Sequence, residues 1–319
     1  MTPPDTPTAV IALGGNALAP AGEKSTIYDQ FRHARESLGP IVDLARDGWN
    51  VCVVHGNGPQ VGDELMRNEV ARAEATPLPL GVLVAATAGW IGYMLQQSIE
   101  NALLRGGSRR DVATIITQVE VRADDPAMLD PSKFIGQPLS EQRAEEVRRD
   151  GHVVKADGRG HLRRVVGSPV PQAIHELETI KRLVEQGTLV VACGGGGAPI
   201  YLNVLREWEG LDAVIDKDLA AAVLARDLGA KLLLILTDVD AVYANWGTPQ
   251  QRALRHLTVE EAEHMDRAGA FGEGSMAPKV RAAIDFARRT GGRAIITVLS
   301  RGQDAVRGEA GTTITAETA

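Results

Sequence analysis

Residues 10–18 read VIALGGNAL: an apolar run, two glycines, an asparagine, and then apolar residues again. The first run is short and β-branched, which is typical of a strand buried on both faces of a parallel sheet. Glycine lets the chain turn sharply and lets backbone N–H groups approach a ligand closely. The stretch therefore predicts a buried strand that ends in an anion-binding turn, and it raises the question of which side chain supplies the cation.

Apolar runs of the same kind recur along the chain. They are short, rich in β-branched residues and mostly not alternating, so they also suit strands buried on both faces of a sheet. With the opening run, they cover residues 8–13, 50–55, 112–119, 188–193, 231–237 and 293–299.

Amphipathic stretches of helical length lie between these runs. They cover residues 31–48, with an internal Gly-Pro, and 171–187, 218–230 and 279–292. The last two close on glycine, as helices often do. Alternating strands and helices predict βαβ units with right-handed crossovers. The expected fold is therefore α/β, with helices packed on a mainly parallel sheet.

Residues 122–166 break this alternation. Proline, glycine and charged residues dominate the segment, and two short strand-like pieces within it are expected to form a hairpin across residues 157–160. We interpret the segment as a flap inserted in a single α/β domain that spans residues 1–319. A disordered loop is the alternative.

Bulk properties exclude several classes of function. The chain has 319 residues and a formal net charge of −7, which argues against general nucleic-acid binding because that rests on a basic surface. The N-terminus lacks a signal-peptide pattern and no apolar stretch is long enough to span a membrane, so we expect a cytoplasmic protein. Cys52 and Cys193 lie in apolar segments and are expected to be reduced core thiols rather than a disulfide or a reactive pair.

Glycines follow three of the expected strands. Gly14, Gly15 and Asn16 follow the first, residues 55–62 (HGNGPQVG) include the end of the second, and four glycines at 194–197 follow a later one. Ligands of parallel sheets usually bind where the strands end, and a helix start just downstream favours phosphate or carboxylate. A tight turn alone explains one such stretch, but three together predict an anion site. Neither the GxGxxG fingerprint nor the Walker loop is present.

Lysines elsewhere in the chain are candidates for the missing cation. Lys133 lies in the flap, and Lys279 lies in the first turn of an expected helix. Lys217 stands between Asp216 and Asp218 where another helix is expected to start. A solvated helix cap and a partly buried ion cluster explain this Asp-Lys-Asp sequence about equally well. By itself, Lys279 is explained as an ordinary surface lysine.

Residues 237–249 (TDVDAVYANWGTP) add polar and aromatic residues at the end of a strand. Tyr243 and Trp246 either close the edge of the core or line a slot for a flat base.

Eight segments together resemble the carbamate kinases of the amino acid kinase family in order and spacing. They span nearly the whole chain and read VIALGGNAL, HGNGPQVG, AGWIGYMLQQ, ETIKRLVEQG, ACGGGGAPI, AVIDKDLAAA, ILTDVDAVYANWGTP and GSMAPKV. Other members of the family, such as acetylglutamate kinase, usually carry lysine in the first strand, just before the glycine pair. Ala12 holds that place here, as in carbamate kinases, and the resemblance implies that Lys217 substitutes for the lysine.

The resemblance implies a three-layer αβα sandwich with a protruding flap, assembled as a homodimer. It implies reversible phosphoryl transfer between ATP and carbamate, giving ADP and carbamoyl phosphate. Mg²⁺ would sit on phosphate oxygens and water, with no dedicated protein metal site. The N-terminal part would bind the acceptor, and the C-terminal part, about residues 190–319, would bind the nucleotide.

The resemblance also implies roles for single residues. Lys217 would bridge the moving phosphoryl group, and Asp218 would hold the lysines in place. Lys279 would contact the distal phosphates of the nucleotide, and Lys133 would close over the acceptor. Backbone N–H groups for the acceptor or phosphoryl group would come from Gly14, Gly15, Asn16, Gly56, Asn57, Gly58, Gly194 and Gly195. The nucleotide would contact Asp238, Tyr243, Met276 and Lys279.

Two residues depart from the family pattern. Phe134 stands where proline is usual and bears on the shape of the flap, and Ala277 stands where glycine is usual. One alternative keeps the fold but changes the acceptor to another small carboxylate or a phosphonate, for which Arg163 and Arg164 are candidate recognition groups unless they are only surface charges. The other is a non-catalytic nucleotide-binding module, which the presence of all three lysines disfavours.

Overall fold

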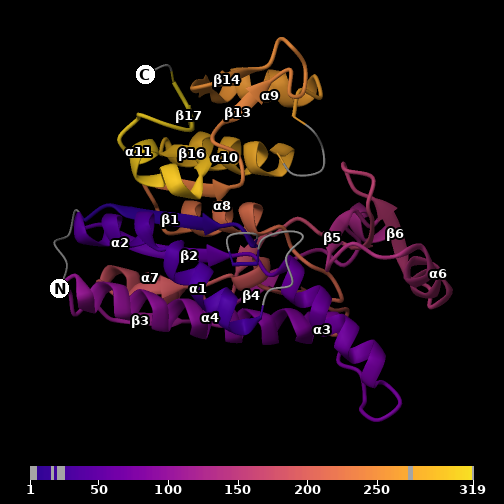
Figure 1. Cartoon of the computed structure of the whole chain (residues 1–319). Helices are drawn as coiled ribbons and strands as arrows, with labels where there is room; N and C mark the ends of the chain where they lie inside the picture. Colours follow the sequence, from indigo (N-terminus) through magenta and orange to yellow (C-terminus); the bar gives the residue numbers. More distant parts are fainter. Residues whose placement is uncertain (1–5, 16–17, 20–25, 272–275, 318–319) are drawn as a thin grey trace.

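The computed structural model describes residues 6–15, 18–19, 26–271 and 276–317. Within them, the central sheet has eight strands in the order β15-β17-β16-β12-β1-β2-β9-β3 (Figure 1). Neighbouring strands are parallel except for β16 and β17. In chain order the strands are β1 (Thr8–Leu13), β2 (Asn50–His55), β3 (Val112–Thr114), β9 (Leu189–Val191), β12 (Leu232–Thr237), β15 (His256–Thr258), β16 (Arg293–Val298) and β17 (Thr312–Thr315).

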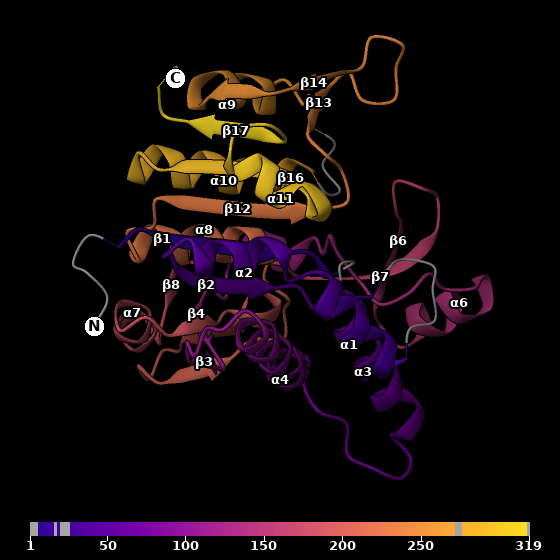
Figure 2. The ribbon, with the colours of Figure 1, turned by 60° about the vertical axis from the view of Figure 1, so that its left-hand side comes forward.

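Helices cover both faces of this sheet, and each face has its own apolar core (Figure 2). Along β1, Val10 and Ala12 belong to one core, whereas Ile11 and Leu13 belong to the other, which explains why the opening run is apolar throughout. The first core is covered by α7 (Leu177–Glu185), α8 (Lys217–Asp227), α9 (Val259–Arg267) and α10 (Met276–Thr290). The second is covered by α1 (Ile27–Glu36), α2 (Gly39–Arg46), α4 (Leu80–Arg105) and α11 (Gly302–Val306). The predicted three-layer αβα sandwich is confirmed.

Smaller sheets extend the sandwich. A four-stranded sheet has the order β11 (Trp208–Gly210), β10 (Ala198–Leu202), β4 (Gln118–Glu120) and β8 (Ala173–Ile174). A separate hairpin pairs β13 (Val242–Ala244) with β14 (Arg252–Leu254). Short 3₁₀ turns occupy Gly194–Gly196 and Leu299–Arg301.

The flap stands apart from the sandwich in Figure 1 and has a sheet of its own. Its antiparallel strands have the order β5 (Lys133–Ile135), β7 (Leu162–Val166) and β6 (Val153–Ala156), accompanied by α5 (Pro126–Leu129) and α6 (Glu141–Arg149). β6 and β7 form the predicted hairpin, closed where the Asp157 N–H donates to the His161 carbonyl at 2.9 Å. The alternative of a disordered loop is wrong.

A single helix connects the glycine turn after β2 to the flap. α3 (Gly58–Ala71) starts inside that turn, and the Gly58 carbonyl accepts a hydrogen bond from the Gly136 N–H at 3.0 Å, just after β5. Gly62, one turn along α3, lies so close to Gly136 that a Cβ built on it would be 2.0 Å from the Gly136 Cα. The flap therefore rests directly on α3.

Two helix predictions need correction. Residues 31–48 form two helices rather than one, because Pro40 lacks the N–H that a continuous helix would need and instead lies in the first turn of α2. Residues 171–187 form a helix only from Leu177, because Ala173 and Ile174 pair with β4 as a strand.

The strand expected at residues 112–119 is also divided. Its start is β3 in the central sheet and its end is β4 in the four-stranded sheet. Between them, where the chain passes from one sheet to the other, the Thr117 hydroxyl donates to the Ile115 carbonyl at 2.9 Å. α4 was not predicted, because a helix that is apolar on most sides shows no clear helical period.

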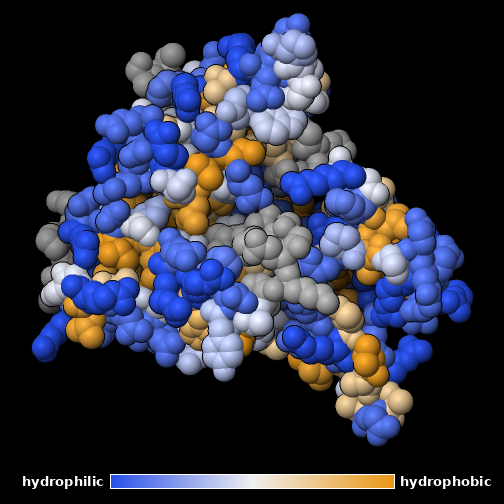
Figure 3. Space-filling model, viewed as in Figure 1, coloured by the Kyte–Doolittle hydropathy of each residue, from blue (hydrophilic) through white to orange (hydrophobic). Residues whose placement is uncertain are grey.

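Other expectations concern the thiols and the surface. Cys52 and Cys193 are free and buried, as predicted, and burial raises the pKa of Cys52 to about 12. No helix in the described part of the chain is long and apolar enough to cross a membrane. On the face drawn in Figure 3, hydrophilic residues dominate and apolar residues lie in scattered patches.

The contact between Gly62 and Gly136 predicts the effect of adding one methyl group. Glycine to alanine normally stabilises a helix interior by about 1 kcal/mol, but in Gly62→Ala the new Cβ would meet backbone that must move. We expect a net destabilisation of about 1–3 kcal/mol, measured by thermal unfolding. Gly39→Ala, where nothing lies within 4 Å of the new Cβ, is the matched control. A Gly62→Ala protein as stable as Gly39→Ala would contradict the contact.

Candidate active site

Asp216 caps α8 and also binds a lysine from the flap. Its Oδ1 accepts hydrogen bonds from the backbone N–H groups of Asp218, at 2.9 Å, and Leu219, at 3.3 Å. Its Oδ2 accepts a hydrogen bond from Lys133 Nζ at 2.5 Å. Asp216 is therefore a helix cap, as one explanation of the Asp-Lys-Asp sequence predicts, but the cap is not solvated: its side chain is only 13% exposed and belongs to the partly buried ion cluster of the other explanation.

Asp218 binds the other two candidate lysines. Lys217 Nζ lies 2.5 Å from its Oδ1 and Lys279 Nζ lies 3.0 Å from its Oδ2, while the Asp218 side chain is only 2% exposed. Lys279 comes from the first turn of α10, which packs beside α8. Three lysines from the flap, α8 and α10 thus meet two carboxylates at one helix start, where the helix dipole also favours an anion.

Burial and neighbouring charges act in opposite directions on these groups. Burial disfavours the charged form of Asp218, but Lys217 and Lys279 outweigh it and hold the pKa of Asp218 below its usual value. The pKa of Asp216 is lowered in the same way, with Lys133 as the main opposing charge. Burial lowers the pKa of Lys217 although Asp218 opposes the shift. Three lysines against two aspartates leave an excess of one positive charge in this group.

The glycine turns meet beside this cluster. β1, β2 and β9 are neighbours in the sheet, so the turns that follow them lie at one edge. A Cβ built on Gly56 would be 2.9 Å from the Gly15 nitrogen and 3.3 Å from Lys217 Cδ. A Cβ on Gly195 would be 2.3 Å from Asn57 Nδ2. The structure thus brings the first turn, the second turn, the third turn and Lys217 together.

The remaining predicted anion ligands lie around the same edge or outside the described residues. A Cβ on Gly14 would be 3.2 Å from the Leu236 carbonyl, at the end of β12. Gly58 begins α3 and contacts the flap through its carbonyl. Asn16 lies outside the described residues.

His55, the last residue of β2, packs under two of the turns. Its Nδ1 lies 3.0 Å from the Gly56 carbonyl, which can only accept, so Nδ1 carries the proton in this contact. A Cβ on Gly194 would be 2.5 Å from His55 Nε2. Burial lowers the pKa of His55 to about 4, and the nearby charge of Lys217 acts in the same direction. The ring is therefore neutral at physiological pH.

The residues predicted to bind the nucleotide lie toward α10 and β12. Asp238 directly follows β12, and its charge helps to raise the pKa of Lys279, after Asp218 and Asp216, against the effect of burial. The Tyr243 hydroxyl donates to Asp240 Oδ1 at 2.6 Å, and its ring meets Trp246 edge-on with centroids 5.3 Å apart. Met276 is the first residue of α10 and packs against the core.

The residues that depart from the family pattern, and the flap arginines, all make specific contacts. Ala277 is a buried residue of α10, where its methyl group fits the helix. Arg163 stacks over the Phe134 ring at 5.5 Å and donates to the Gly136 carbonyl at 2.7 Å. Arg164 forms an ion pair with Glu69 of α3. The interpretation of these arginines as mere surface charges is wrong.

Contacts that support the site were missed from the sequence. Asn57 Nδ2 donates to Thr87 Oγ1 of α4 at 2.9 Å, and the Cys193 N–H donates to Thr117 Oγ1 at 2.9 Å. The sequence around these two threonines does not predict the contacts, because each bond joins residues that are far apart in the chain. His55 did carry one, since it directly precedes a glycine turn. In the described residues, no three His, Cys, Asp or Glu side chains are grouped so as to hold a metal ion.

Known proteins match this arrangement over nearly its whole length. The amino acid kinase family signature matches residues 7–297. A carbamate kinase of Escherichia coli O6:H1 is 47% identical over 308 residues, covering 96% of this chain and 99% of that protein. The solved structure of a carbamate kinase from Giardia lamblia bound to citric acid has a TM-score of 0.92 at 37% identity, covering 98% of this chain and 99% of that one. The structure of the same enzyme bound to AMP-PNP has a TM-score of 0.89 at the same identity and coverage. The chain therefore belongs to the amino acid kinase family. Within that family it falls among the carbamate kinases, which confirms the resemblance.

The lowered pKa of His55 predicts an acid-sensitive contribution to stability. Between its ordinary pKa of 6.5 and its folded pKa of about 4, the unfolded chain binds a proton that the folded chain does not. The contribution is therefore complete above about pH 6.5 and is lost as the pH falls toward 4, by about 3 kcal/mol in total. Chemical unfolding across this range should show a steeper loss of stability for the wild type than for His55→Gln. Parallel pH profiles would contradict the assignment.

Proposed function

We propose that the chain is a carbamate kinase, which transfers a phosphoryl group reversibly between ATP and carbamate and gives ADP and carbamoyl phosphate. The observation that carries the proposal is the convergence of Lys133, Lys217 and Lys279 on the two aspartates at the start of α8. The glycine turns after β1, β2 and β9 lie beside them. Carbamate kinases as relatives over nearly the full length support the same activity.

This arrangement suits phosphoryl transfer because that reaction asks little covalent chemistry of the protein. Positioning and charge neutralisation supply most of the catalysis. Each lysine ammonium has three donors, so an amine can keep its aspartate and still donate to a phosphate oxygen. Lys217 would bridge the moving phosphoryl group, while Lys279 would contact the distal phosphates and Lys133 would close over the acceptor. Asp218, with Asp216, would hold these amines in place.

Backbone groups complete the proposed site. The N–H groups of Gly14, Gly15, Asn57 and Gly58, with those of Gly194 and Gly195, would face the acceptor or the moving phosphoryl group. The prediction for Gly56 needs correction, because its N–H already donates to the Leu13 carbonyl at 3.0 Å; this glycine instead leaves room for Gly15 and Lys217. Asp238, Tyr243 and Met276 would contact the nucleotide. The N-terminal part would thus bind the acceptor, and the part from about residue 190 onward would bind the nucleotide, within one domain that carries the flap at about residues 122–166.

Mg²⁺ fits the site as a companion of the nucleotide. The Asp216 carboxylate forms an ion pair with Lys133, and the Asp218 carboxylate forms ion pairs with Lys217 and Lys279. Neither carboxylate is therefore open to a metal ion. Mg²⁺ commonly binds phosphate oxygens and water with few protein ligands, and it would neutralise phosphate charge there. The homodimer and the cytoplasmic location stay predictions of the sequence analysis.

The flap contacts favour a small acceptor. A larger carboxylate or phosphonate would need a recognition group, and Arg163 and Arg164 were the candidates. Arg163 is held by Phe134 and Gly136, and Arg164 is held by Glu69. A panel of carboxylates at fixed ATP tests this choice: carbamate should be preferred, and preference for a larger acceptor would contradict it.

Replacing Lys217 should remove much of the catalysis. The wild type should form ATP from ADP and carbamoyl phosphate, and Lys217→Ala should lower kcat by about 10²–10³-fold, the scale found for single electrostatic donors. A coupled assay of ATP formation measures both proteins. Lys155→Ala is the matched control, because Lys155 is a flap lysine that pairs with exposed Asp130.

Several outcomes would contradict the proposal. No turnover by the wild type would end it, and ATP binding without transfer would favour the non-catalytic module. Equal losses in Lys217→Ala and Lys155→Ala would show that the effect is not specific to the site.

A further inference from the structure

The flap is attached to α3 at two points. Near the start of α3, the attachment is the close backbone contact of Gly58 and Gly62 with Gly136. Near its end, the attachment is ionic and centres on Glu69. Beside the first contact, Ile135 of β5 and Val166 of β7 also pack with Val61 of α3 in a small apolar core. The ionic contact adds a second region of attachment, through α6 and β7, and so limits rotation of the flap about its base.

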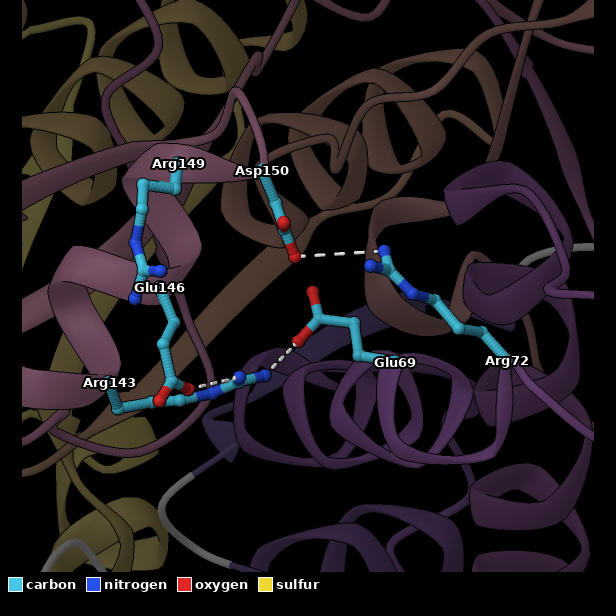
Figure 4. Close-up of a pocket in the computed structure, with 6 residues that line it drawn as sticks. All are labelled: Glu69, Arg72, Arg143, Glu146, Arg149 and Asp150. Carbon is cyan, nitrogen blue, oxygen red and sulfur yellow. Dashed lines mark hydrogen bonds and ion pairs between the residues drawn. The ribbon is translucent and has the colours of Figure 1, made fainter.

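Glu69 joins two elements of the flap at once. It forms ion pairs with Arg143 of α6 and with Arg164 of β7. Figure 4 shows the Glu69 carboxylate of α3 joined to Arg143 of α6 by an ion pair. Both side chains line a cavity whose volume is about 230 Å³. Arg72, which directly follows α3, and Asp150 of the flap form a further ion pair at 3.7 Å, but their side chains are 62% and 41% exposed. Glu69 and Arg164, at 19% and 13%, are far better shielded from water.

Without the negative charge of Glu69, the positive charges of Arg143 and Arg164 would repel each other. Burial lowers the pKa of Arg164, and the neighbouring charge of Arg143 adds to this effect, while Glu69 acts against both. Arg164 Nε is buried and has no hydrogen-bond partner among the described residues. An unpaired, shielded guanidinium is costly, so the flap would move outward to hydrate it.

The pairing of β5 with β7 links the ion pairs of Glu69 to Lys133 in the candidate active site. β7 pairs with β5 so that Arg164 lies opposite Ile135 and Val166 lies opposite Lys133. Arg164 is therefore tied to the short strand that carries Lys133, whose amine must reach Asp216 across 83 residues of chain. α3 itself starts within the second glycine turn, so one helix links that turn, Glu69 and the flap.

We propose that Glu69 is a positioning residue: by holding Arg143 and Arg164, it sets the angle at which the flap presents Lys133 to the acceptor. The inference rests on the proposed function. It concerns the acceptor side of the reaction and leaves nucleotide binding untouched.

The test compares two glutamates that share a partner. Glu69→Gln removes the contact between the flap and α3, whereas Glu146→Gln removes the other carboxylate bound to Arg143, at 2.8 Å, which lies within α6. In Glu69→Gln, kcat/KM for carbamoyl phosphate should fall by on the order of tenfold while the KM for ADP stays within about twofold. Glu146→Gln should behave as the wild type. A merely structural loss of active enzyme would lower kcat and leave both KM values unchanged, so that kcat/KM would fall equally for carbamoyl phosphate and ADP.

Coupling between the partners provides a second readout. Arg164→Gln alone, and Glu69→Gln with Arg164→Gln, should each show about the same change in kcat/KM as Glu69→Gln, because contacting residues are not additive. Multiplied losses in the double variant would show that the two residues act separately and would overturn the inference.

Hydrogen exchange reports the flap position without catalysis. The Gly136 amide, bound to the Gly58 carbonyl, should exchange faster in Glu69→Gln, while the amides of the β6–β7 hairpin stay protected because the flap itself remains folded. If Glu69→Gln does not fold, Glu69→Asp, which keeps the charge but shortens the reach, should show a smaller change in the same direction. Wild-type kinetics and exchange in the variant would overturn the inference and leave the proposed function standing. An inactive wild type would instead end the proposed function, and the exchange result would still decide whether Glu69 docks the flap.

Discussion

Asp218 is almost wholly buried, and its charge is balanced by Lys217 of its own helix and by Lys279 of α10. An unpaired buried carboxylate costs several kcal/mol, so the folded chain has to bring ammonium groups to it. Lys279 comes from α10 and Lys217 from the start of α8, while Asp216 next to them draws Lys133 from the flap. This requirement joins segments that are remote in sequence, and the same amines then face the anion site.

The sheet provides the other half of the site. Since β1, β2 and β9 are adjacent and parallel, the turns that follow them gather at one edge without any contact needed to bring them there. Glycine allows those turns to approach one another and Lys217 within van der Waals distance. Neutral His55 fills the space beneath them without adding a charge that would compete with the cluster. Strand order therefore gathers the backbone amides, and ion pairing gathers the ammonium groups, so the two halves of the site have independent causes.

Much of this could be predicted from local pattern. Short β-branched runs predicted the buried strands, and two short apolar pieces predicted the β6–β7 hairpin. Pairings across the fold were not predictable: nothing near Lys133 or Asp216 indicates that they meet, and Glu69 looks like an ordinary helix surface residue. Residues 112–119 form one uninterrupted β-branched run, which predicts one strand, because the pairing of its two ends with different sheets depends on distant strands. The roles given to the lysines came from family resemblance, since local sequence explained Lys279 equally well as a surface residue.

A crystal structure with a non-hydrolysable ATP analogue tests the central claim most directly, through the distance from Lys217 Nζ to the nearest terminal phosphate oxygen. The account predicts about 3 Å, with Lys279 also bound to the nucleotide phosphates and Asp218 still holding both amines. A terminal phosphate bound elsewhere, with the lysines occupied only by Asp216 and Asp218, would contradict it and reduce the cluster to a structural ion network.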